Sequence, residues 1–207
     1  MPTSTFFNLP EEKRRRLIAA GFEEFSEFTI DKASISSIIR AAKIPRGSFY
    51  QYFDGKEDLH SYILNLYSKR WGERWVELLK QHHGDIFSTL PEFFAIFLDE
   101  MTDSKKARFW HNTMMSFQNE KTQKRIRKHS AKRTNEYFNA QMIDSSLLRI
   151  KLTPENENLL LHHIISMLMQ STHYYFYIKQ TTNKDPRQEA INHFNKLLDW
   201  IEYGIRE

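Results

Sequence analysis

Apolar side chains recur at every third or fourth position along almost the whole 207-residue chain, which is the spacing of an amphipathic helix. We find no stretch with the strict alternation of apolar and polar residues that marks a half-buried strand. Glycine and proline, six of each, are rare enough to allow long helices with few tight turns. The pattern predicts an all-α protein of about nine helices, with one core or two adjoining ones.

The helix boundaries are expected where caps and prolines interrupt this spacing. We expect helices at about residues 8–28, 34–42, 45–52, 56–81, 88–101, 105–117, 120–143, 154–180 and 186–207. Ser34 is placed to cap the second helix, and Asp54 with Glu57 forms a capping box for the fourth. Pro45 separates the second helix from the third, because proline disfavours a helical conformation in the residue before it and suits the first turn of a new helix.

The two short helices at 34–42 and 45–52, joined by a brief turn, are typical of a helix-turn-helix. Ile44, Phe49 and Phe53 lie about one helical turn apart and can dock the shorter helix onto the preceding one. The side chains left on its other faces are those of Arg46, Ser48, Tyr50, Gln51 and Tyr52. Arginine and glutamine can read base edges, and hydroxyl groups can contact phosphates. The stretch predicts DNA binding, with a compact helical corner stabilised by aromatic residues as the alternative.

Two segments carry a family resemblance: RLIAAGFEEF at 16–25 and ASISSIIRAAKIPRGSFYQYFDGKEDL at 33–59. Residues 13–60 resemble the DNA-binding domain of the tetracycline-repressor (TetR) family of bacterial transcription regulators. The implied DNA contacts are Ser34, Ser36, Pro45, Arg46, Gly47, Ser48, Tyr50, Gln51 and Tyr52, with Lys56 as a clamp on the DNA backbone. The resemblance also implies a DNA-binding domain at 1–60 and a helical domain at 61–207 that binds a small ligand and dimerises.

Three positions depart from the family's usual pattern. Lys43 stands where the family usually has a turn glycine, so its backbone is expected to be forced toward the left-handed conformation at some cost. Pro45 replaces the serine or threonine that commonly caps the recognition helix. Gln51 occupies a position that is often histidine, which bears on the operator sequence rather than on DNA binding itself.

The last two helices carry more apolar surface than a single stripe needs. A stripe with spacings of 3, 4, 3 and 4 begins at Ile191, and Leu197 with Trp200 opens a second stripe beside it. We expect a homodimer closed by two helices from each subunit, with an intrachain core as the alternative. The expected interface residues are Leu161, Ile164, Leu168, Ile191, Phe194, Leu198, Ile201 and Ile205.

Methionine and aromatic residues are abundant after residue 61, and together they can make an adaptable apolar cavity with a few hydroxyl groups. The expected lining is Phe93, Phe94, Phe97, Trp110, Met114, Met115, Phe117, Met167, Tyr174 and Tyr177. Ordinary core is the alternative for each of them. The composition favours a small hydrophobic or aromatic effector, which we expect to shift the helix that starts near Lys56 and so the spacing of the two recognition helices in a dimer.

Other kinds of site find little support. The chain has no cysteine, which excludes disulfides and cysteine zinc sites and fits a reducing cytoplasm. His162, His163 and His173 lack the i, i+4 spacing of a metal-binding pair, so neither a metal nor a cofactor is expected. No window approaches about 18 apolar residues, so no membrane segment is expected.

The densest basic run comprises Lys121, Lys124, Arg125, Arg127, Lys128, Lys132 and Arg133, in a chain of net charge +4. We interpret it as a solvated helix face, with a secondary nucleic-acid or anionic-ligand surface as the alternative. The sequence contains no glycine-rich phosphate loop, nucleophile elbow or zinc motif, so no catalytic residue is expected. We expect a cytoplasmic, ligand-responsive repressor that binds a palindromic operator as a dimer and is released by its effector. An enzyme, or a helical small-molecule-binding protein without DNA-binding activity, is the alternative.

Overall fold

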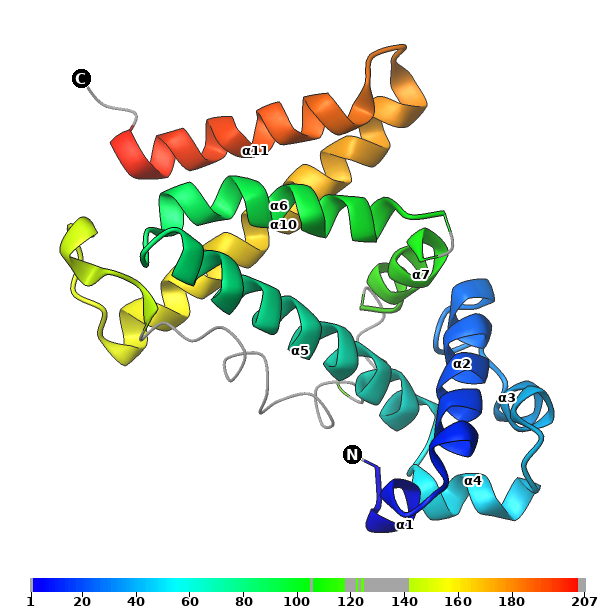
Figure 1. The fold of residues 1–207 in the computed structure, drawn as a ribbon. Helices are drawn as coiled ribbons and strands as arrows, with labels where there is room; N and C mark the ends of the chain where they lie inside the picture. The colour runs from blue at the N-terminus through cyan, green and yellow to red at the C-terminus, as the bar shows by residue number, and fades with distance from the viewer. Residues whose placement is uncertain (1, 105, 118–121, 123, 125–141, 205–207) are drawn as a thin grey trace. The chain divides into compact units, whose positions relative to one another are not determined.

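The computed structural model describes residues 2–104, 106–117, 122, 124 and 142–204. Over these residues it contains nine α-helices and no strand, which confirms the all-α prediction (Figure 1). The helices are α1 (Ser4–Phe7), α2 (Glu11–Glu27), α3 (Ile35–Ala42), α4 (Arg46–Tyr52), α5 (Lys56–Gln81), α6 (Ile86–Thr102), α7 (Ala107–Phe117), α10 (Pro154–Thr181) and α11 (Pro186–Tyr203), with a 3-10 turn, η2, at Ser145–Leu147. The sequence did not predict α1. The helix expected at 120–143 lies almost entirely outside the described residues.

The chain divides into two compact units, Met1–Lys69 with Thr102–Thr134, and Arg70–Met101 with Asn135–Glu207. Helix α5 contributes residues to both units, and α7 belongs with the N-terminal helices although it follows α6 in the chain. The first unit therefore extends beyond residue 60, where the sequence places the end of the DNA-binding domain.

In the first unit, α7 packs against α2 and also donates hydrogen bonds to backbone carbonyls at the C-terminal end of α2. Leu17 and Phe25 of α2 and Ile38 of α3 are fully buried. The side-chain amide of Asn112, on α7, donates to the carbonyls of Phe25 at 3.2 Å and Ser26 at 3.0 Å. The last carbonyls of a helix have no partner within the helix, so this amide caps α2 from outside.

Lys43 ends α3 in the left-handed conformation, with φ 54° and ψ 47°, which confirms the expectation for this position. The amide of Ile44 donates to the carbonyl of Ile39 at 3.1 Å, and the amide of Lys43 donates to that of Arg40 at 3.2 Å. This pair of bonds is the Schellman ending of a helix, in which glycine is the usual left-handed residue. The turn therefore has the usual Schellman hydrogen bonds, but its left-handed position holds a lysine, for which that conformation is unfavourable.

Replacing Lys43 with glycine is expected to raise the free energy of unfolding by about 1 kcal/mol, because glycine adopts this conformation without the steric cost of a Cβ atom. Urea denaturation measures the change. The matched control is Arg40→Gly, an exposed position inside the last turn of α3, where glycine should cost about 1 kcal/mol. Equal destabilisation by both variants would contradict the assignment of strain to Lys43.

In the second unit, α11 is held against α6 by one apolar and one ionic contact. The rings of Phe94 and Phe194 stack with centroids 4.2 Å apart, and both side chains are fully buried. Arg187 binds the carboxylate of Asp99 through two parallel hydrogen bonds of 2.7 and 2.9 Å. Because the ion pair is exposed, most of the stabilisation comes from the buried rings.

Candidate functional site

The expected helix-turn-helix is present, with a turn of three residues between the end of α3 at Ala42 and the start of α4 at Arg46. Phe49 and Phe53 have no exposed surface, and Ile44 is half-buried. The inward face of α4 is thus the one that the helical spacing of these three residues indicated.

The residues expected to contact DNA fall into three groups by exposure. Ser36, Pro45, Arg46, Gly47, Tyr50 and Gln51 are exposed, whereas Ser34, Ser48 and Lys56 are half-buried. Tyr52 is buried, and its ring lies 6.4 Å from that of Phe6, so it contributes mainly to the core. We call Arg46, Tyr50 and Gln51 the recognition surface: three long polar or aromatic side chains on the exposed side of a helix whose other side is buried.

Hydrogen bonds that involve side chains stabilise the first turns of α3 and α5, the helices on either side of α4. The hydroxyl of Ser34 accepts a hydrogen bond from the amide of Ser37 at 3.4 Å, as expected, while the amide of Ser34 donates to the carboxylate of Glu24 at 2.6 Å. At the start of α5, the amide of Asp54 donates to the carboxylate of Asp58 at 3.2 Å. The reciprocal bond expected with Glu57 is thus made one residue further on, by a side chain that is almost fully buried.

Pro45 and Gly47 begin α4 without the usual stabilising features. Pro45 occupies the cap position, and its side chain makes no capping hydrogen bond. A Cβ atom added at Gly47 would meet nothing within 4 Å, so the packing of this chain does not require glycine there. Open space at the start of α4 is compatible with the close approach of another molecule.

Lys56 has a structural role that the sequence did not indicate. Its ammonium group donates to the carbonyl of Asp31 at 2.7 Å and to that of Ala33 at 2.9 Å. It therefore ties the loop between α2 and α3 to the first turn of α5. An ammonium group has three N–H donors, so these two bonds occupy most of its capacity.

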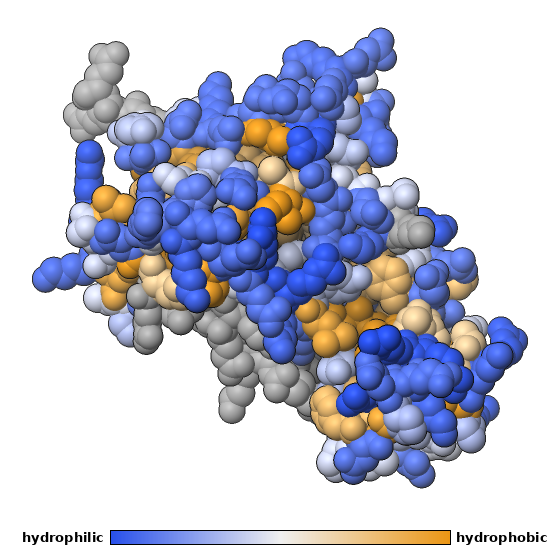
Figure 2. All heavy atoms as spheres, viewed as in Figure 1, coloured by the Kyte–Doolittle hydropathy of each residue, from blue (hydrophilic) through white to orange (hydrophobic). Residues whose placement is uncertain are grey.

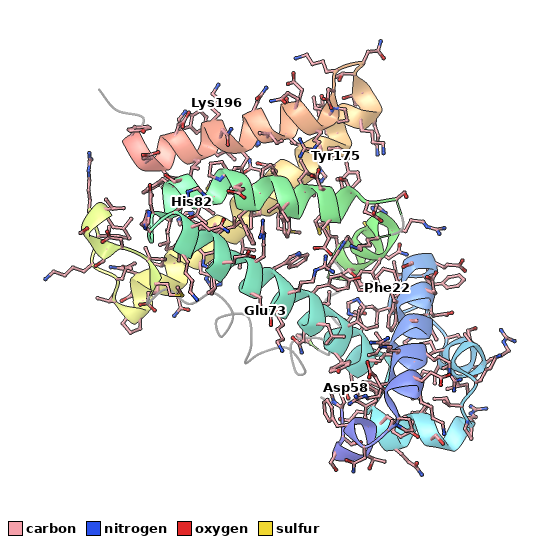
Figure 3. All side chains as sticks on the ribbon, in the orientation of Figure 1. Phe22, Asp58, Glu73, His82, Tyr175 and Lys196 are labelled. Atoms are coloured by element: carbon pink, nitrogen blue, oxygen red, sulfur yellow. The ribbon has the colours of Figure 1, made fainter. Side chains whose placement is uncertain are left out.

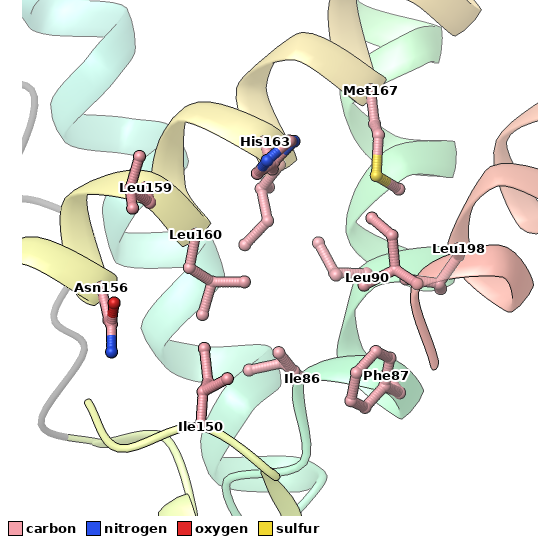
Figure 4. Close-up of a pocket in the computed structure, with 12 residues that line it drawn as sticks. Ile86, Phe87, Leu90, Ile150, Asn156, Leu159, Leu160, His163, Met167 and Leu198 are labelled. Carbon is pink, nitrogen blue, oxygen red and sulfur yellow. The ribbon is translucent and has the colours of Figure 1, made fainter. Parts of the chain in front are cut away.

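The second unit contains a cavity of about 290 Å³ between α6, α10 and α11 (Figure 4). It is lined by Ile86, Phe87, Leu90, Ile150, Asn156, Leu159, Leu160, His163, Ile164, Met167, Leu198 and Ile201. Only Asn156 and His163 of this set bring polar side chains. A volume near the lower end of the range for small-molecule sites, about 300–1,000 Å³, suits a compact apolar ligand.

The residues expected to line an effector pocket are not gathered around one cavity. Met167 lines the cavity of Figure 4, whereas Phe93, Phe94 and Phe97 are buried in the packing of α6. Tyr174 stacks on His193 at 4.5 Å, and Tyr177 is exposed. Trp110, Met114 and Met115 belong to the first unit. The side chain of Phe117 is not among those that the structure describes.

Most of the expected dimer residues face the core of their own chain. Leu161, Ile164, Leu168, Phe194 and Leu198 are buried, Ile191 is half-buried, Ile201 is exposed, and Ile205 lies outside the described residues. On the face drawn in Figure 2 the surface is mainly hydrophilic, with apolar side chains exposed in separate patches. The large apolar side chains exposed on α10 and α11 are Leu159, Tyr177, Trp200, Ile201 and Tyr203.

His60 is a buried titratable group that no pattern in the sequence indicated. It lies on α5, where Figure 3 marks nearby Asp58, with no exposed surface. Its Nε2 atom is 3.0 Å from the hydroxyl of Thr113, on α7, and its ring packs on Phe25 and Phe109. Its Nδ1 atom has no hydrogen-bond partner among the described residues. Burial lowers the pKa of His60 from 6.5 to about 3, so the imidazole is neutral in the folded protein.

The basic run at 121–133 is described at only one of its charged residues. Lys124 is described and exposed, whereas the rest of the basic run lies outside the described residues. Within the described ranges, no group of three or more histidine, cysteine, aspartate or glutamate side chains could hold a metal ion. No helix that the structure describes is long and apolar enough to cross a membrane.

Two segments of this chain match known protein families. Residues 17–63 match bacterial regulatory proteins of the tetR family, and residues 85–205 match the tetracyclin repressor-like C-terminal domain. The transcriptional regulator AcrR of Shigella flexneri is 29% identical over 98 residues, which are 47% of this chain and 46% of the relative. The repressor NemR of Escherichia coli K12 is 25% identical over 89 residues, 43% of this chain and 45% of the relative. The matches span about half the length of these two relatives.

A solved structure shares the fold over nearly the whole chain. The regulator FadR of Bacillus subtilis, in complex with stearoyl-CoA, superposes with a TM-score of 0.61 at 16% identity, covering 93% of this chain and 99% of that one. The shared architecture thus extends through the described part of both compact units.

Proposed function

The chain belongs to the tetR family of bacterial regulatory proteins, and we propose that it represses transcription by binding a palindromic operator as a homodimer, from which a small apolar effector releases it. The observation that carries the DNA-binding part is the two-sided helix α4. Phe49 on one side is fully buried, and Tyr50 beside it is 57% exposed. The division into a DNA-binding part at 1–60 and an effector and dimerisation part at 61–207, and action in the cytoplasm, are parts of the same proposal.

Selection from a pool of random duplexes tests operator binding. A dimer with two-fold symmetry should select two inverted half-sites whose centres lie about 34–36 Å apart, one turn of DNA, or a multiple of it. Recovery of no common sequence, or of a single half-site, would contradict the proposal.

Arg46→Ala is expected to weaken binding to the selected duplex by at least about tenfold, because an arginine contact to a guanine or to a phosphate is lost in each subunit. If the contact is to a phosphate, the slope of log affinity against log salt should also flatten by about 0.9 per contact. Fluorescence anisotropy at several salt concentrations gives both quantities. Arg108→Ala, an exposed arginine on α7, is the matched control. Equal affinity of the two variants would show that Arg46 does not contact the DNA and would contradict its place in the recognition surface.

We propose the cavity between α6, α10 and α11 as the effector site. Ten of its twelve lining residues are aliphatic, methionine or phenylalanine, while Asn156 and His163 can orient one polar group of a ligand. The B. subtilis regulator of the same fold is in complex with stearoyl-CoA, a ligand that includes a long apolar acyl chain. The cavity volume, about 290 Å³, favours a compact apolar molecule.

Decanoate, 1-decanol and 1-naphthol are suitable probes for thermal-shift and titration measurements. Filling the cavity by Leu160→Trp should weaken binding of the best probe at least about tenfold, whereas Leu197→Trp, on α11 and outside the lining, should leave it unchanged. The selected operator duplex should weaken probe binding by the same factor by which the probe weakens operator binding, since coupling between two sites is reciprocal. Binding that Leu160→Trp leaves intact would move the effector site elsewhere.

A further inference from the structure

The segment before α2 contacts the C-terminal end of α4, although the two are about 50 residues apart in the chain. The amide of Thr3 donates to the carbonyl of Tyr52 at 3.0 Å, and the hydroxyl of Thr3 donates to the carbonyl of Gln51 at 2.5 Å. One residue thus provides two hydrogen bonds to the last turn of the helix that carries the recognition surface.

These two bonds matter because α4 has little stability of its own. A helix of seven residues is far shorter than the ~12–15 that an isolated helix needs. It includes Gly47 and has no side-chain cap at Pro45. Its final carbonyls lack intrahelical partners, as in any helix, and the amide of Phe53 satisfies only that of Phe49, at 3.0 Å. Thr3 satisfies the carbonyls of Gln51 and Tyr52.

Phe6 anchors this segment in the core. Its side chain has no exposed surface. Its ring centroid lies 4.9 Å from that of Phe53, which follows α4, and 5.2 Å from that of Tyr62 on α5. The ring therefore holds Thr3 in place against helices that are themselves packed. The neighbouring Phe7 is 48% exposed, so only one of the two adjacent phenylalanines is a buried anchor.

We propose that residues 2–6 position the recognition surface on DNA. In this arrangement Thr3 and Phe6 are positioning residues: they hold the turn that carries Tyr50 and Gln51 and need not touch DNA themselves. The proposal rests on the proposed function, because it assigns a consequence for operator binding. If residues 2–6 hold the recognition surface in place, changes in this segment should weaken binding to the operator sequence more than binding to DNA of any other sequence.

The test compares Thr3→Val with Thr3→Ser, with any purification tag placed at the C-terminal end. Valine keeps the shape of threonine and removes the hydroxyl, so Thr3→Val should weaken binding to the selected operator by about tenfold in the dimer. Thr3→Ser keeps the hydroxyl and should stay within about twofold of the wild type. Binding to a scrambled duplex should stay within about twofold for both variants. Unchanged operator binding by Thr3→Val, or equal losses on operator and scrambled duplex, would overturn the proposal.

Hydrogen exchange separates failure of this proposal from failure of the proposed function. Without any DNA, Thr3→Val and Phe6→Ala should increase amide exchange in α4 relative to α3, whereas the control Phe28→Ala, at an exposed phenylalanine that ends α2, should not. If the wild type selects no operator while the variants show this exchange pattern, operator binding is refuted, but the role of residues 2–6 in holding α4 is upheld. Exchange in α4 that is equal in Thr3→Val and wild type would overturn the positioning role whatever the DNA result.

Discussion

Trp200→Glu is expected to convert the proposed dimer to a monomer and to weaken operator binding by about a thousandfold or more. Trp200 is 49% exposed and lies two residues beyond the buried Leu198, about 200° around α11, so it points away from the chain's own core. Exposed tryptophans are frequent anchors of protein interfaces. A glutamate in a two-fold interface is buried twice without a partner, at a cost of several kcal/mol.

Light scattering gives the oligomeric state, and anisotropy gives the operator affinity. The matched control is Leu147→Glu, an equally exposed apolar residue on η2, which should remain dimeric. A Trp200→Glu protein that is folded and still dimeric would place the interface elsewhere. Leu198→Glu cannot serve as this test, because Leu198 is buried within the chain and a charge there would unfold the monomer itself.

Acid is expected to reduce the free energy of unfolding through His60 by about 2 kcal/mol at pH 5. The folded-state pKa is lowered to about 3, whereas the unfolded chain takes up the proton near 6.5. The neutral imidazole therefore contributes its full stabilisation above about pH 6.5. This contribution is lost by about 1.4 kcal/mol per pH unit as the pH falls from there toward 3.

The control for this prediction is His60→Gln, which does not titrate and can keep a hydrogen bond to Thr113. The side chains packed on His60, those of Phe25, Phe109 and Thr113, do not titrate either. Guanidinium denaturation of both proteins between pH 7.5 and 5 isolates the contribution, because all other groups titrate alike in the two. Parallel stability curves for the two proteins would show that His60 is protonated, or solvated, in the folded state.

Local spacing and backbone chemistry in the sequence were enough to predict the helix-turn-helix and most of the described helices, though not α1. Phe49 and Phe53 are separated by one helical turn, and both are buried as expected. Lys43 is left-handed because the Schellman ending of α3 places its C-terminal flanking residue in that conformation. These features depend on neighbours within a few residues, which is the range over which sequence periodicity and capping rules apply.

The structure alone decided which partner each side chain meets across the chain. The spacing in α11 shows two stripes, but only the stacking of Phe194 on Phe94 identifies the stripe that faces its own core. Apolar composition predicted a cavity, but its lining depends on how α6, α10 and α11 pack. The support of α4 by Thr3, the burial of His60 and the loop contacts of Lys56 join residues 23 to 53 positions apart. Such contacts follow from the packing of distant segments, which local pattern does not encode.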